Sequence, residues 1–155
     1  MTALNSEWRN GDLHLLLNKD VTAELSMVNA QSMVLFHYHD FFEMELVVEG
    51  EGYQFFDGKK FSLKKGDVFL CTTMDSHEIW GNLKLRHLQV RESALSDALL
   101  LKAYSLPNPL VLSLPENKAK RMDTMLQLIE EEGQDEKSNL FVINDLTDAV
   151  LQIFF

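Results

Sequence analysis

The sequence predicts a mainly β protein: an antiparallel β-barrel followed by two or three α-helices. Short apolar or alternating runs with turn signals between them recur as far as residue 90, which is typical of β-sandwiches and barrels. After residue 95 the apolar residues recur every three or four positions, the period of a helix. We therefore expect a barrel over residues 1–113 and a helical segment over residues 114–155.

Alternation and turn residues place the individual strands. Asp57-Gly58 lies between two aromatic-rich runs and predicts a hairpin, because glycine accepts positive φ. Lys65-Gly66-Asp67 predicts a second turn. The expected strands cover residues 13–17, 24–28, 33–38, 43–49, 53–56, 61–63, 68–71, 77–80, 84–90 and 110–112.

Three helices are expected, over residues 96–104, 114–133 and 138–155. Ser113 as N-cap, Pro115 in the first turn and Glu116 as the capping-box acid predict the start of the second helix. Gly133 predicts its end. The last helix carries an apolar stripe that we expect to support a homodimer as well as the core: Leu140, Ile143, Leu146, Val150 and Ile153. Because the chain stops on the apolar Phe155, we expect it to be part of a longer protein.

Charge and cysteine content exclude several functions. The net charge is −10, with 8 basic and 13 acidic residues up to position 90 and 6 and 11 after it, so each part carries −5. This even acidity argues against nucleic-acid binding by the chain alone. No secretion signal or membrane-length apolar run is visible. Cys71, the only cysteine, lies in an apolar run and is expected to be buried and inert in a cytoplasmic protein.

Histidines and one carboxylate form the most informative pattern. His37 and His39 are two residues apart on an expected strand, so their rings share a face. Glu43 follows on the next strand, and His77 comes eleven residues after Gly66. Together they could hold a divalent transition metal, which could be Mn, Fe, Ni, Zn or Cu. The alternative is a metal-free polar cluster satisfied by its own hydrogen bonds.

Further side chains are candidates for contact with a ligand. Glu45 shares the face of Glu43 and either lines the cavity or is turned outward by a bulge, and we favour the outward orientation. Trp80, Phe36 and Trp8 could stack on a sugar, although core packing explains them equally well. Isolated histidines are expected in ordinary core or surface positions: His14 and His87. The candidate ligand-binding set is His37, His39, Glu43, Glu45, His77 and Trp80.

Residues 37–50 resemble the first motif of the cupin superfamily: His-x-His, three residues, Glu, six residues, Gly. The upstream glycine of that motif is replaced by Gln31. Gly66 and His77 match the second motif, whose Pro, Gly and Asn positions are occupied here by Thr72, Met74 and Gly81. The resemblance implies a cupin-like barrel in which the four metal positions of the family are kept: His37, His39, Glu43 and His77.

A wider stretch, about residues 30–133, resembles the sensor domain of AraC-type transcription regulators. Residues 42–52 are similar to its strand "F-E-L-x-x-V-x-E-G-x-G", and residues 57–70 to its hairpin "G-x-x-y-x-L-x-x-G-D-v-f-l". This resemblance implies a non-enzymatic domain that binds a small-molecule effector, such as a sugar or related metabolite, and dimerises through its C-terminal helices. DNA would be bound only by a C-terminal helix-turn-helix domain, which these residues do not contain.

The alternative is a stand-alone cupin metalloenzyme, an oxygenase or isomerase. In that protein His37, His39, Glu43 and His77 would hold the metal and leave positions open for a substrate. The pattern leaves open the effector, the operator and the sign of regulation.

Overall fold

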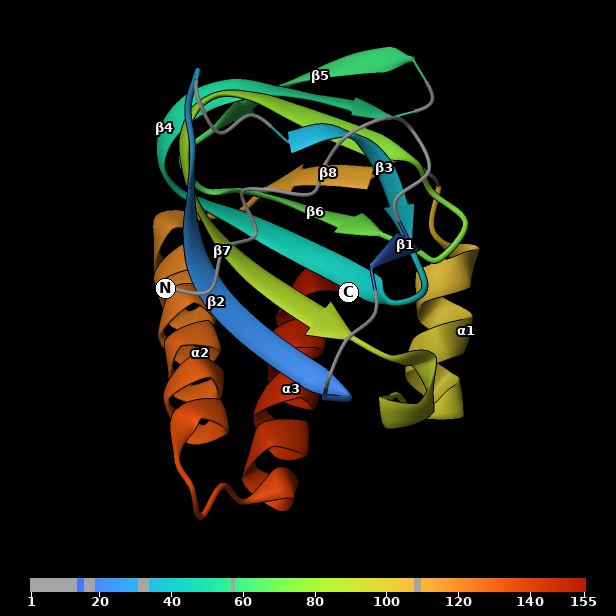
Figure 1. Cartoon of the computed structure of the whole chain (residues 1–155), viewed down its shortest axis with the longest axis vertical. Helices are drawn as coiled ribbons and strands as arrows, with labels where there is room; N and C mark the ends of the chain where they lie inside the picture. Colours follow the sequence, from blue (N-terminus) through green and yellow to red (C-terminus); the bar gives the residue numbers. More distant parts are fainter. Residues whose placement is uncertain (1–13, 16–18, 31–33, 57, 108–109) are drawn as a thin grey trace.

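The computed structural model describes residues 14–15, 19–30, 34–56, 58–107 and 110–155. Trp8, Gln31 and most of the strand expected at residues 13–17 lie outside these ranges. Eight strands form one curved sheet with the helices on its outer side (Figure 1). The strands are β1 (His14–Leu15), β2 (Val21–Val28), β3 (Val34–His39), β4 (Phe42–Phe56), β5 (Lys59–Lys64), β6 (Asp67–Cys71), β7 (His77–Val90) and β8 (Leu110–Ser113). The helices are α1 (Asp97–Ser105), α2 (Glu116–Gln134) and α3 (Leu140–Phe154), with a short 3₁₀ turn at Glu92–Ala94.

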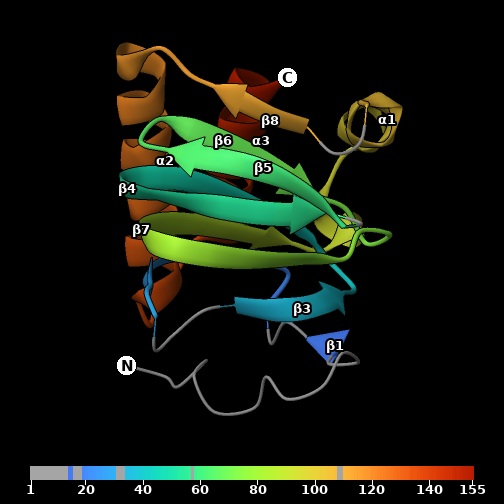
Figure 2. The same cartoon turned by 90° about the horizontal axis from the view of Figure 1, so that it is seen from above.

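The two longest strands, β4 and β7, pair antiparallel along their whole length and form the spine of the sheet. The far edge of β7 pairs with β2 and β3, and that of β4 with β5 and β6. Figure 2 shows β3 and β1 on one side of this spine and β6 and β8 on the other. The expected mainly β, cupin-like barrel followed by helices is confirmed.

Each spine strand replaces two expected strands, so the predicted breaks near Gly50–Gly52 and Gly81–Leu83 are wrong. Gly52 and Gly81 are paired across the ladder. Gly81 has a φ of +137°, and a Cβ atom there would lie only 2.5 Å from the Cα of Gly52. The two glycines therefore let the strands approach and bend without ending.

Alternation along the strands separates two hydrophobic cores. The inner core fills the barrel with the buried residues Val28, Val47, Phe56, Leu63, Phe69, Cys71, Ile79, Leu83 and Leu85. On the opposite face, Met44 and Leu46 of β4 belong to a second core shared with the helices. α2 contributes Met122, Leu126 and Ile129 to it.

The helices agree with the sequence expectations in place but not in every detail. α1 lies where a helix was expected, and Ser96 is its N-cap, accepting a hydrogen bond from the backbone N–H of Leu99. The capping box at Ser113 is wrong, because Ser113 ends β8 and donates its hydroxyl to Asp67 Oδ1. α2 begins at Glu116, with Pro115 as its N-cap.

The apolar stripe of α3 serves mainly the chain's own core. Ile143 and Val150 are buried against α2 and the sheet, and Leu146 and Ile153 are partly buried there. Leu140, the first residue of the stripe, is 69% exposed. Among the described residues no helix is both long and apolar enough to cross a membrane.

Candidate functional site

The four residues of the predicted metal set converge inside the barrel. His37 and His39 come from β3, Glu43 from β4 and His77 from the first position of β7. All four are almost completely buried, and each offers a ligand atom within 4.8 Å of the others. The parity argument for His37 and His39 is therefore confirmed in three dimensions.

Backbone carbonyls fix the orientation of the two β3 histidines. The Nδ1 atom of His37 lies 2.8 Å from the carbonyl oxygen of Leu35, and that of His39 lies 2.6 Å from the carbonyl oxygen of Phe41. These bonds place the ring proton on Nδ1 and leave Nε2 as the atom that can accept or coordinate.

The third histidine is oriented by side chains instead. His77 Nδ1 lies 2.9 Å from Gln54 Nε2 and 3.3 Å from Cys71 Sγ. Gln54 is fully buried, and its Oε1 has no hydrogen-bond partner within the described part of the chain. Rotating the amide by half a turn would let Oε1 accept a hydrogen bond from the Nδ1–H group of His77 and leave His77 Nε2 as the ligand atom.

Glu43 occupies the centre of the cluster. Its Oε2 lies 3.4 Å from His39 Nε2 and 3.3 Å from His77 Nε2, while its Oε1 accepts a hydrogen bond of 3.1 Å from Gln89 Nε2. Burial alone would raise the pKa of Glu43, but its contacts with the surrounding imidazoles hold that pKa well below its usual range. Glu43 is therefore a carboxylate at neutral pH.

The neighbouring histidines respond to this charge differently. Burial, followed by the charge of His77, lowers the pKa of His37 to about 4, so its ring is neutral. Burial also acts to lower the pKa of His39, but Glu43 outweighs it and the pKa of His39 is raised. The cluster is thus a carboxylate ringed by imidazoles of unequal basicity.

Glu45 points into the barrel, so the favoured outward orientation is wrong. Its side chain is 2% exposed, and Oε1 lies 2.7 Å from Nδ1 of His87. The register shift that marks the bulge falls between Val47 and Glu49, beyond Glu45. The strand is regular up to Glu45, and Glu43 and Glu45 therefore share the inner face.

His87 is a site residue that the sequence interpretation missed. Its Nε2 is hydrogen-bonded to the hydroxyl of Ser26 on β2. Burial alone would lower the pKa of His87, but Glu45 and Glu43 raise it well above its usual value. The signal was present, since His87 lies ten residues after His77 and thus on the same face if one strand connects them.

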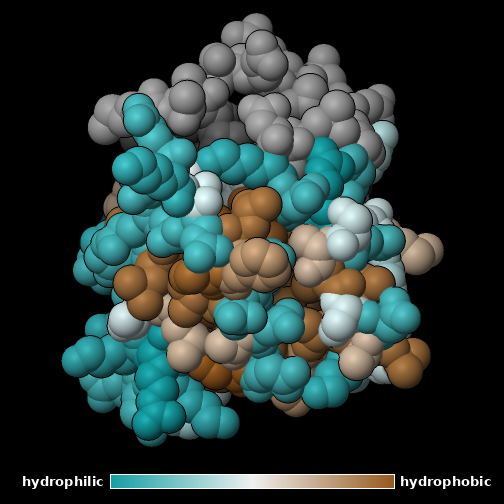
Figure 3. All heavy atoms as spheres, turned by 90° about the horizontal axis from the view of Figure 1, so that it is seen from below, coloured by the Kyte–Doolittle hydropathy of each residue, from teal (hydrophilic) through white to brown (hydrophobic). Residues whose placement is uncertain are grey.

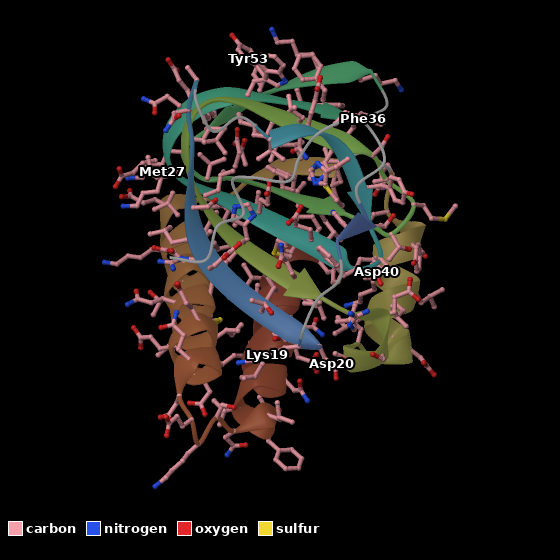
Figure 4. The ribbon with its side chains drawn as sticks, viewed as in Figure 1. Lys19, Asp20, Met27, Phe36, Asp40 and Tyr53 are labelled. Carbon is pink, nitrogen blue, oxygen red and sulfur yellow. The ribbon has the colours of Figure 1, made fainter. Side chains whose placement is uncertain are left out.

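The two aromatic candidates within the described residues, Trp80 and Phe36, do not lie at the cluster. Trp80 is 40% exposed and three residues from His77, which puts it on the opposite face of β7. Phe36 is 47% exposed on the outside of the barrel (Figure 4). Cys71 is buried as expected, and burial together with nearby carboxylates raises its thiol pKa well above the usual value.

The donor set fits a divalent transition metal. His39 Nε2 and His77 Nε2 have no hydrogen-bond partner among the described residues, and their separations from Glu43 exceed good hydrogen-bond lengths. Ligand atoms about 2.1 Å from a common ion lie about 3.0–3.4 Å apart, which matches the 3.4 and 3.3 Å measured here. Three imidazoles and a carboxylate suit Mn, Fe, Ni, Zn or Cu.

This fold and this buried polar cluster define a cupin-type ligand-binding barrel. Residues 19–143 match the family model of the AraC-like ligand binding domain, and the chain belongs to that family. No curated protein matches its sequence.

Three solved structures illustrate the similarity. ToxT from Vibrio cholerae has a TM-score of 0.62 at 9% identity, over 89% of this chain and 55% of that one. The AraC-like transcriptional activator CuxR has a TM-score of 0.52 at 19% identity, over 73% and 42%. A cupin protein from Bacteroides fragilis has a TM-score of 0.46 at 20% identity, over 50% and 71%. The chain thus spans about half of each of the two regulators.

Proposed function

We propose that this chain is the effector-sensing domain of an AraC-type transcription regulator and has no enzymatic activity. The main observation behind this proposal is a buried polar cluster inside a barrel of the ligand-binding family. The cluster consists of His37, His39, Glu43, Glu45 and His77. Each buried polar group left unpartnered costs about 1–3 kcal/mol, and such a cost is typical of a site kept for a ligand. A small polar metabolite such as a sugar suits these donors and acceptors.

A divalent transition metal at His37, His39, Glu43 and His77 is the second part of the proposal. The ion would supply a Lewis-acidic contact for an oxygen of the effector. The protein's own part is to hold the imidazoles through Leu35, Phe41 and Gln54 and to exclude water.

Effector contacts would reach the helices through β7. Arg86 immediately precedes His87. Its side chain projects from the outer face of the sheet and forms ion pairs with Asp123 and Glu130 of α2. We place the protein in the cytoplasm, as a homodimer formed through α2 and α3. DNA binding is assigned to a helix-turn-helix domain outside these residues, and the division at residue 113 stays a prediction.

A thermal-shift screen of sugars and related metabolites tests the sensing function. A true effector raises the melting temperature of the wild type and of the control variant Glu51→Gln. Glu51 is exposed and lies on β4, the strand that carries Glu43. The same compound does not raise the melting temperatures of His39→Ala and Glu43→Gln, because both substitutions alter the cluster. The screened compound is then recovered and analysed. An unchanged compound supports sensing, whereas metal-dependent conversion supports the oxygenase or isomerase alternative.

A further inference from the structure

The two oxygens of Glu43 face two different sets of partners. Oε2 lies between His39 and His77, on the side of the four-residue cluster. Oε1 faces away from them, toward Gln89 at 3.1 Å and toward Nδ1 of His87 at 3.7 Å. The carboxylate therefore lies between two groups of ligating atoms.

The second group is itself a built site. Glu43, Glu45 and His87 each offer a ligand atom within 4.8 Å of the others, and all three side chains are buried. The hydroxyl of Ser26 holds His87 at Nε2 and so directs Nδ1 toward the carboxylates. Glu45 Oε2 is buried and has no hydrogen-bond partner in the described ranges.

We propose that Glu43, Glu45 and His87 form a second divalent-cation position, with Glu43 bridging it to the four-residue position. The separations of His87 Nδ1 from Glu45 and Glu43 are 2.7 and 3.7 Å. They bracket the distance of about 3.0–3.4 Å expected for neighbouring ligand atoms around one ion. Two carboxylates and one imidazole favour Mn, Fe or Zn.

Charge supports a cation at this position. Two carboxylates, Glu43 and Glu45, lie close together here, and both are buried. A divalent cation held between the two carboxylates would offset their mutual repulsion. Ser26 holds the imidazole of His87 in the orientation that a ligand at this position would need.

Metal stoichiometry tests the second position. Chelator-treated protein is dialysed against Mn²⁺, and bound metal is measured by elemental analysis. The wild type and the exposed control Glu51→Gln should bind about two equivalents, whereas Glu45→Gln and His87→Gln should each bind about one. Electron paramagnetic resonance of the doubly loaded wild type should show two spin-coupled Mn²⁺ ions, and this measurement needs no variant to fold.

The outcomes separate this inference from the metal proposed at the first position, with which it shares Glu43. One equivalent in the wild type, unchanged in Glu45→Gln, overturns the second position and leaves the first. Two equivalents that persist in Glu45→Gln also overturn it. No bound metal overturns both positions, while effector sensing by the polar cluster still stands on its own test.

Discussion

Arg86 and His87 are consecutive residues of β7 whose side chains project from opposite faces of the sheet. His87 lies inside the barrel with its Nδ1 2.7 Å from Glu45 Oε1. Arg86 lies outside, with Nε 3.0 Å from Asp123 and Nη1 2.5 Å from Glu130 of α2. Neighbouring residues on a strand alternate between faces, so one peptide unit separates the polar cluster from the helices. The contact to α2 and the contact to the polar cluster are therefore made by adjacent residues of one strand.

Replacing Arg86 tests the strength of this anchor. The Arg86 side chain is 8% exposed, and Arg86→Met would leave the carboxylates of Asp123 and Glu130 without their cation. Because both carboxylates are partly solvated, we expect a loss of about 2–3 kcal/mol in the free energy of unfolding, less than for a fully buried pair. Urea denaturation measures this loss.

Lys84 provides the matched control, since it lies two residues from Arg86 on the same face. Its ion pair with Glu49 is solvent-exposed, with Glu49 66% accessible. Lys84→Met should therefore change the stability by less than about 0.5 kcal/mol. Equal effects of the two substitutions would show that Arg86 is no special anchor.

The convergence of the four metal-set residues could be predicted partly from a local rule and partly from the resemblance to the cupin motifs. Parity on a short strand places His37 and His39 together, and the spacing to Glu43 and His77 follows a known pattern. His87 could not be placed in the same way. Its face is linked to that of His77 only if β7 runs on through Gly81, and this depends on Gly52 across the ladder.

The orientation of Glu45 shows a second limit of sequence reasoning. A bulge was expected and is present, but it falls after Val47 and not before Glu45. The place of a bulge depends on the register of the partner strand, which no local pattern specifies. The same applies to α3, where packing against α2 decides that Val150 is buried and Leu140 is exposed.

The glycine pair gives a stability prediction. In Gly81→Ala the new Cβ would lie 2.5 Å from Gly52 Cα, at a φ of +137° that side chains rarely adopt. We expect a loss of about 2–4 kcal/mol in the free energy of unfolding. Gly58 is the control, because it also has positive φ, +77°, but open space around it. Gly58→Ala should cost only about 1 kcal/mol, and comparable losses in the two variants would contradict the close-approach argument.

The exposed start of α3 is the best place to test dimerisation. Phe141 is 82% exposed and Leu140 is 69% exposed, and Figure 3 shows apolar side chains gathered across the lower face of the molecule. If this surface is the homodimer contact, Phe141→Glu should reduce the sedimenting mass from dimer to monomer without loss of the far-ultraviolet spectrum. Leu146 is less suitable, because it packs on the core.

Leu101 on α1 is the control for that experiment, since it is 71% exposed but lies on another helix. Leu101→Glu should leave the sedimenting mass unchanged. A monomeric wild type, or a dimer that survives Phe141→Glu, would rule out this surface.

The stability of the metal-free protein should pass through a maximum near pH 6.5. On the acid side, the lowered pKa of Glu43 means that its stabilisation is present above its ordinary value of 4.5 and is lost as the pH falls further. The pKa of His37 is about 4 in the folded protein and 6.5 in the unfolded chain. As the pH falls from 6.5 to 4, only the unfolded chain binds this proton, so the stability also decreases over that range. The raised pKa of Glu24 opposes these losses only in part, because Glu24 is partly solvated.

On the alkaline side, the raised pKa values of His39 and His87 determine the slope. Their stabilisation is complete below the ordinary histidine value of 6.5 and is lost as the pH rises from there through their folded values. Urea denaturation with a chelator present, between pH 4 and 7.5, measures both limbs at pH values where the thiol of Cys71, whose ordinary pKa is 9.0, stays almost entirely protonated even in the unfolded chain. His87→Gln should flatten the alkaline limb and His37→Gln the acid limb. A wild-type profile that stays level from pH 6.5 to 7.5 would contradict the charged His87–Glu45 contact, because a neutral His87 releases no proton in that range.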